Sequence, residues 1–182
     1  MTRKNPGFSM LELLIAVAII GVIAAFALPS AINFVKSYRL HADASAVASQ
    51  LNLTRFRATS QYTPYRLRID AANRLFFRER LNSSYGSPAA EEAYPLQVGN
   101  AFLSADPVTA RPGTLDSTFS GVSTSIYFNT RGLPVDSTGT PTNSNVVYLQ
   151  NSSNLNDAVT VSLGGRITIW NYSAGSGAWV AR

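Results

Sequence analysis

Residues 8–28 read FSMLELLIAVAIIGVIAAFAL, an apolar run in which Ser9 and Glu12 are the only side chains that are neither apolar nor small. At 1.5 Å per residue, a helix of this length spans about 31 Å, which is enough to cross the hydrocarbon core of a bilayer. Arg3 and Lys4 precede the run, and positive charge is retained on the cytoplasmic side of a membrane. The sequence therefore predicts a membrane-spanning helix with the remainder of the chain outside the cytoplasm.

The presence of Glu12 in this helix disfavours a signal peptide that serves only for targeting. A carboxylate in an apolar segment costs about 2.5 to 3.5 kcal/mol on insertion scales, and such a charge is by default a functional group that awaits a partner. Two alternatives stay open. One is an uncleaved single-span anchor, and the other is a secretory signal cleaved after Ala25-Phe26-Ala27.

The order Gly7-Phe8-Ser9-Met10-Leu11-Glu12, with the apolar run and Pro29 after it, closely resembles the class III signal of type IV pilins and type II secretion pseudopilins. The resemblance implies that a prepilin peptidase cleaves between Gly7 and Phe8 and methylates the new amine of Phe8. It also implies a role for Glu12 in subunit assembly, in which its carboxylate pairs with the N-terminal ammonium of a neighbouring subunit.

After Pro29 the helical pattern continues as an amphipathic stretch to about Thr59. A spacing of four and three residues predicts one stripe that packs on a sheet, formed by Leu40, Ala44, Val47, Leu51, Thr54 and Ala58. Polar side chains lie largely off that stripe, at Lys36, Arg39, Asp43, Gln50 and Arg57. Because proline removes one backbone donor and clashes with the preceding turn, we expect a helix break at Pro29, as a kink or a locally melted stretch.

Beyond Ser60 the chain consists of short β-rich runs between polar segments. We expect a hairpin over residues 65–69 and 74–80, strands over 122–128 and 145–150, and a hairpin over 159–163 and 166–170 with a two-residue Gly164-Gly165 turn. Residues 82–95 and 104–121 are expected to be surface loops. The predicted fold class is α+β: a long N-terminal α-helix, with a membrane-spanning half and an amphipathic half, packed on a C-terminal antiparallel β-sheet domain.

The C-terminal half is similar to the GspH/FimT group of minor pilins and pseudopilins over roughly residues 120–170. The similarity lies in a strand that ends near Phe128, a loop at Gly132, a strand over 146–149, and a strand that enters Gly165-Arg166. The expected organisation is a cleaved leader over 1–7, a transmembrane and polymerisation helix over 8–29, an amphipathic helix of the globular domain over 30–60, and a β-rich periplasmic or extracellular domain over 61–182.

Composition disfavours most enzyme classes. The chain has no cysteine and one histidine, His41, so it cannot supply a Cys/His zinc site, a thiol nucleophile or a disulfide framework. We expect His41 to be solvated or packed, and we expect Trp170, Tyr172 and Trp179 to be core residues or cross-strand pairs. Glu91-Glu92 lies in an expected loop with no apolar pocket. We therefore predict no enzyme activity, no cofactor and no metal site.

Arginines are concentrated in the first predicted hairpin. Strict alternation places on one face Tyr65, Leu67, Ile69, Leu75, Phe77 and Leu81, and on the other face Arg66, Arg68, Arg74, Phe76, Arg78 and Arg80. Arginine suits phosphate and an interleaved aromatic ring can stack on bases, which makes Arg66, Arg68, Phe76, Arg78 and Arg80 candidate nucleic-acid contacts. The favoured alternative is a solvated face, or one that meets the acids of a neighbouring subunit.

Arg166 joins these candidates through the resemblance. FimT-like proteins linked to DNA uptake carry a Gly-Arg-x-Arg signature, and this chain has Gly165-Arg166-Ile167-Thr168, which lacks the second arginine.

Together these features predict a minor pilin or pseudopilin with a priming, tip or minor structural role in a type IV pilus or a type II secretion pseudopilus. The subunit is expected as a single-pass protein of the bacterial inner membrane before it enters the filament. The resemblance implies as partners other pilin or pseudopilin subunits, prepilin peptidase, the inner-membrane assembly platform and membrane lipid before assembly, with DNA as a further partner in the DNA-uptake alternative. A major type IV pilin, and a DNA-binding pilus subunit for DNA uptake, are the alternatives.

Overall fold

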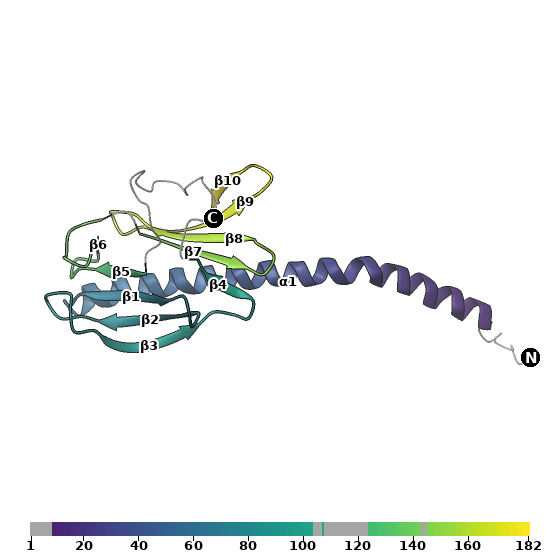
Figure 1. The fold of residues 1–182 in the computed structure, drawn as a ribbon, viewed down its shortest axis with the longest axis horizontal. Coiled ribbons are helices and arrows are strands. Elements are labelled where there is room, and N and C mark those ends of the chain that lie inside the picture. The colour runs from purple at the N-terminus through teal and green to yellow at the C-terminus, as the bar shows by residue number, and fades with distance from the viewer. Residues whose placement is uncertain (1–8, 104–106, 108–123, 143–144) are drawn as a thin grey trace, which may run out of the picture. The chain divides into compact units, whose positions relative to one another are not determined.

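The structure is a computed structural model that describes residues 9–103, 107, 124–142 and 145–182 (Figure 1). The chain divides into two units, Met1–Val35 and Lys36–Arg182. Helix α1 (Met10–Ser60) supplies the described part of the first unit and the first element of the second. Each unit is described by itself.

In the first unit α1 continues through Pro29, so the helix is not melted there, and a kink at Pro29 stays a prediction. The proline ring removes only the one hydrogen bond that its own nitrogen would donate, and the bonds of the adjacent turns remain. None of the side chains described between Ser9 and Val35 is buried. This segment is long and apolar enough to cross a membrane.

The second unit contains two five-stranded antiparallel sheets. The first sheet has the order β3-β2-β1-β5-β6 and consists of β1 (Tyr65–Asp70), β2 (Leu75–Arg80), β3 (Ala89–Pro95), β5 (Ser125–Phe128) and β6 (Pro134–Val135). The second sheet has the order β10-β9-β8-β7-β4 and consists of β4 (Asn100–Phe102), β7 (Asn145–Asn151), β8 (Asn156–Val161), β9 (Ile167–Ser173) and β10 (Ala178–Ala181). The predicted α+β class, a long N-terminal helix packed on antiparallel sheet, is confirmed.

One core joins the helix to both sheets. All six residues of the predicted stripe of α1 are buried. They meet inward side chains of the first sheet, such as Leu67 and Phe128, and of the second sheet, such as Val147 and Val159. Asp43, expected off the stripe, is buried as well. A smaller cluster of Val146, Tyr148, Ala158 and Trp179 belongs to the second sheet alone, and Trp179 pairs with Tyr172 across β10 and β9, as expected of these aromatic residues.

Arg55 of α1 connects the turns of the two sheets. Its Nε donates to the carbonyl oxygen of Gly132, between β5 and β6, at 3.0 Å, and its Nη1 donates to the carbonyl oxygen of Gly165, between β8 and β9, at 2.9 Å. Both glycines have positive φ, 74° and 77°. A Cβ on Gly165 would lie 2.9 Å from the Gly132 carbonyl oxygen. Glycine is therefore required where these turns approach each other and the guanidinium.

The structure differs from the expected strands in several places. Residues 89–95, expected in a loop, form β3, and β4, β6 and β10 were not predicted. The turn between β8 and β9 has three residues, because the Ser162 nitrogen donates to the Arg166 carbonyl oxygen and leaves Leu163, Gly164 and Gly165 in the loop. Residues 122–123 of a predicted strand, and all of the predicted loop 104–121 except Pro107, lie outside the described residues.

Candidate assembly helix and arginine-rich hairpin

The exposed surface of α1 in the first unit is the candidate assembly surface. Its large side chains include Leu11, Ile15, Ile19 and Phe26, and all are exposed. Glu12 is the only charged side chain among the described residues of this unit and lies in the first turn of the helix. Gly7 and Phe8, the predicted processing site, lie outside the described residues. An apolar cylinder with one carboxylate near its start can pack with other apolar helices and offers a single point for charge pairing.

The predicted arginine face does not exist as one face. Cross-strand partners are Arg66 with Glu79, Leu67 with Arg78, and Ile69 with Phe76. Because directly opposite residues share a face, Arg78 and Phe76 lie on the side of Leu67 and Ile69, away from Arg66. The prediction was wrong because the loop 71–74 has an even number of residues, so the inward positions change from odd numbers in β1 to even numbers in β2.

The outer face of this hairpin carries Arg66 and Arg68 around one carboxylate. Glu79 accepts a hydrogen bond from the Nε of Arg66 and another, at 2.9 Å, from the Nε of Arg68. The Arg66 guanidinium lies 5.6 Å from the ring centre of Tyr127, and that of Arg68 lies 4.3 Å from the ring centre of Phe77. Asp70, two residues after Arg68 in β1, lies on the same face by alternation, so two guanidinium groups and two carboxylates leave no net charge there.

Arg78 is buried, with 2% of its surface exposed. Its Nε donates to Glu91 of β3 at 2.8 Å and its Nη1 donates to Gln50 of α1 at 2.9 Å. Glu91 also accepts hydrogen bonds from Arg57 at 2.6 Å and from the hydroxyl of Tyr65 at 2.7 Å. These contacts join α1, β1, β2 and β3 in one network, which we call the Glu91 network.

Electrostatics within the Glu91 network favour the ionised carboxylate. Burial alone would raise the pKa of Glu91, but hydrogen bonds from Arg78 and Tyr65 and the charge of Arg57 outweigh it, so the pKa is lowered. Burial and the neighbouring Glu91 charge raise the pKa of the Tyr65 hydroxyl. This network has the character of a structural ion cluster, because its charges are paired with each other.

The remaining nucleic-acid candidates are separated. Arg80 and Arg166 are both exposed, and Arg80 is the last residue of β2 in the first sheet, whereas Arg166 follows the turn between β8 and β9 in the second. Of the six candidate residues, only Arg66 and Arg68 share the outer face described here. Nucleic-acid contact itself stays a prediction.

His41 forms the polar contact that the sequence did not indicate. Its Nδ1 lies 2.5 Å from Oδ2 of Asp157, which is buried in β8, and Asn171 donates to Oδ1 of the same carboxylate at 2.8 Å. The Nε2 of His41 faces the Ser37 hydroxyl at 3.2 Å. His41 and Asp157 are 116 residues apart, so no local pattern could have paired them. The contact fixes the start of the second unit's helix against the second sheet.

Comparison with known proteins gives three kinds of likeness. Residues 2–28 match the prokaryotic N-terminal methylation motif. The type IV major pilin protein PilA of Myxococcus xanthus (strain DK1622) is 32% identical over 98 residues, which are 54% of this chain and 43% of PilA. The chain therefore spans less than half the length of that relative.

The third likeness is in the fold. The minor pseudopilin EpsH from the Type 2 Secretion System of Vibrio cholerae superposes with a TM-score of 0.50 at 12% identity, over 73% of this chain and 97% of EpsH. A crystal structure of EpsH matches with a TM-score of 0.49 at 14% identity, over 74% of this chain and 94% of that one. At 12% identity, the superposition on EpsH shows a common fold and nothing more.

Proposed function

We propose that the chain is a member of the type IV pilin and pseudopilin family and acts as a minor subunit, processed by a prepilin peptidase and assembled by helix packing. The observation that carries the proposal is the helix surface over residues 10–35, which is apolar, unburied and interrupted by the single carboxylate of Glu12. Such a surface costs free energy in water and is stable only in lipid or against other apolar helices. The subunit starts in the bacterial inner membrane with its second unit outside the cytoplasm.

Processing is tested by the mass of the mature chain. We expect intact-mass analysis to find a chain that begins with a methylated Phe8, 175 residues long, since 182 minus 7 gives 175. Gly7→Val is expected to abolish the cut, because a β-branched side chain blocks close approach of the peptidase to the backbone. A mature chain that starts at Leu28, or at Met1, would contradict the proposal.

A major pilin is the second candidate, favoured by the 32% identity to a major pilin over 54% of this chain. Abundance separates the two roles. Sheared surface filaments are analysed by quantitative mass spectrometry against labelled standard peptides. A minor subunit is expected far below the most abundant pilin in the same preparation. If this chain is itself the dominant subunit, the minor role is wrong and the major role is right.

The outer face of the first hairpin gives no support to a third role in DNA uptake. Glu79 accepts a hydrogen bond from the Nε of both Arg66 and Arg68, so a carboxylate already offsets the positive charge that a phosphate would need there. Arg78 is buried within the Glu91 network. The proposal therefore rests on assembly.

A further inference from the structure

A short loop between β3 and β4 is held in place by a buried carboxylate. Asp43 of α1, with 4% of its surface exposed, accepts a hydrogen bond from the backbone nitrogen of Gln97 at 2.9 Å and another from the Nδ2 of Asn100 at 2.7 Å. Burial raises the pKa of Asp43 despite these two hydrogen bonds. Burying a charge costs free energy unless the charge is well hydrogen-bonded. The two hydrogen bonds to the Asp43 carboxylate therefore hold residues 97–100 in position.

The loop displays an apolar side chain. Val98 is 80% exposed and precedes Gly99, whose φ of 93° turns the chain toward β4. An isolated exposed valine is ordinary. Val98 differs from an ordinary exposed valine because its loop is fixed by Asp43 and because its side chain lines an open pocket.

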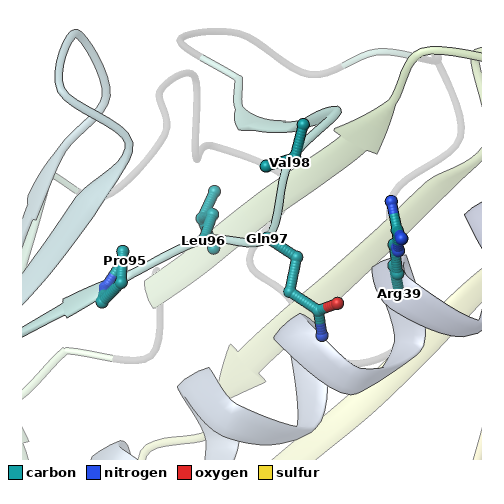
Figure 2. A pocket seen from close by; sticks show the side chains of 5 residues that line it. All are labelled: Arg39, Pro95, Leu96, Gln97 and Val98. Carbon is teal, nitrogen blue, oxygen red and sulfur yellow. The ribbon is translucent and has the colours of Figure 1, made fainter.

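The hollow lies between α1 and the loop. Arg39 of α1 lines an open pocket of about 390 Å³ together with Pro95, Leu96, Gln97 and Val98, and Figure 2 shows the side chains of Arg39 and Gln97 as its polar lining. This volume is within the range that takes a small ligand or a headgroup. The lining combines one guanidinium, one amide and three apolar side chains, so it suits an anionic group attached to an apolar body.

Two further cations lie near the pocket in the chain. The backbone nitrogen of Leu96 donates to the carbonyl oxygen of Arg74 at 2.9 Å, which places Arg74 beside the loop. Lys36 lies one turn before Arg39 on α1, and its Nζ donates to the Ser153 hydroxyl at 3.4 Å. In the described part of the chain, no carboxylate forms an ion pair with Lys36, Arg39 or Arg74. We call Lys36, Arg39, Arg74 and Val98 the basic loop surface.

We propose that the basic loop surface binds the phosphate-bearing headgroups of an anionic phospholipid bilayer, with Val98 inserted among them. Cations that form no ion pair with the described carboxylates, beside an exposed apolar side chain, match the charge and polarity of a lipid interface. The position in the chain supports the same partner, because Lys36 and Arg39 come 8 and 11 residues after Leu28, the last residue of the apolar run. The inference rests on the proposed function, which anchors the chain in a membrane.

The test places a reporter on Val98 in the full-length protein. The chain has no cysteine, so Val98→Cys can carry a single environment-sensitive fluorophore. The matched control is Leu163→Cys, which is 51% exposed in the turn fixed by Arg55, twelve residues or about 18 Å farther along α1 than Asp43. Both proteins are reconstituted into vesicles of phosphatidylcholine alone and of phosphatidylcholine with phosphatidylglycerol, some of which contain a nitroxide-labelled lipid.

We expect the label at position 98 to show blue-shifted emission and quenching by the nitroxide lipid, both stronger with phosphatidylglycerol. The label at position 163 should stay in water in both vesicles. A cation near an anionic surface contributes enough that Arg39→Gln should lower the equilibrium constant for surface contact about fivefold. Arg131→Gln, an identical change at another exposed arginine, should leave it unchanged.

Three results would overturn the inference. The first is a label at position 98 that is as solvent-exposed and unquenched as the label at position 163. The second is an equal loss of quenching in the Arg39→Gln and Arg131→Gln variants. The third is displacement of the label at position 98 from the lipid by an isolated pilin subunit added to the vesicles, because protein rather than lipid would then be the preferred occupant. Flotation of the vesicles separates this failure from failure of the proposed function. Protein that does not float with the lipid contradicts membrane anchoring by α1. Protein that floats while the label at position 98 stays in water contradicts only lipid binding by the basic loop surface.

Discussion

At the scale of single residues, Arg55 holds together turns that belong to different sheets. A guanidinium has five N–H donors in a fixed plane, and Arg55 directs two of its nitrogens at the carbonyl oxygens of Gly132 and Gly165. Nothing in the local sequence marks Arg55 as different from the neighbouring Arg57. The sequence analysis singled out Gly132 and Gly165 as loop and turn residues. Their common hydrogen-bond donor, Arg55, is known only from the structure.

Gly165→Ala should destabilise the domain by about 1 to 3 kcal/mol, because alanine at a positive φ is strained and its Cβ would press on the Gly132 carbonyl oxygen and the Arg55 side chain. The measurement is urea unfolding of a fragment of residues 36–182, followed by circular dichroism. Gly164→Ala is the matched control, since a Cβ there has no neighbour within 4 Å, and it should change stability by less than about 0.5 kcal/mol. Equal effects of the two changes would remove the steric argument.

At the scale of elements, β3 is a strand that the sequence analysis assigned to a loop. Its central residues Glu91 and Glu92 gave no apolar alternation, and most of its side chains are exposed. It is a strand because β2 offers it a pairing edge and because the Glu91 network joins it to α1. Tertiary contacts therefore override a weak local preference.

Arg78→Ala should lower the free energy of unfolding by about 1 to 3 kcal/mol, because a buried side chain is removed and Gln50 and Glu91 each lose a hydrogen bond from it. Arg80→Ala removes an equal charge from an exposed position two residues later in β2 and should cost less than about 0.5 kcal/mol. Urea unfolding of the same fragment, residues 36–182, measures both. A difference between them below about 0.5 kcal/mol would contradict the role given to Arg78.

The Glu91 network should also make stability depend on pH. The pKa of Glu91 is lowered in the folded chain, so the carboxylate contributes stability that is fully present above its unfolded pKa of about 4.3 and is lost as the pH falls through the folded pKa. The stability difference between the fragment and its Glu91→Gln variant should therefore be large at neutral pH and shrink in acid. A difference that stays constant from neutral pH to pH 3 would show that Glu91 acts through packing alone.

How far the sequence could predict each element depends on how local its pattern is. The stripe of α1 was predictable because a helix has one period and Leu40, Val47 and Leu51 follow it. The first hairpin was predictable as a hairpin, but its faces were not, because the number of residues in loop 71–74 decides whether Arg78 points inward. The Glu91 network and the contact of His41 with Asp157 join distant segments, and no local pattern encodes them.

At the scale of the whole molecule, a substitution at Glu12 tests assembly without affecting the folding of the second unit. Glu12→Val should leave membrane insertion intact or improve it, since a charge leaves the apolar segment. Incorporation into filaments should fall about tenfold or more, because a charge-assisted hydrogen bond to a neighbouring ammonium is lost. Quantitative immunoblots of membrane and sheared-filament fractions measure both. Leu13→Val, a change of similar size without a charge, should incorporate normally, and wild-type incorporation of Glu12→Val would contradict the pairing role.

The alternation of the chain between the two sheets sets an order for folding as the polypeptide emerges from a membrane. Strands β1, β2 and β3 are consecutive and can pair as soon as residue 95 is available, but β4 then leaves for the second sheet, where β7 is its only strand neighbour. Residues 100–102 must therefore wait until residues 149–151 arrive. Closing a connection of this length is slow relative to a hairpin. A nascent chain stalled between β6 and β7 would hold a finished first sheet and an open core, which is the state that quality-control proteases and chaperones outside the membrane would encounter.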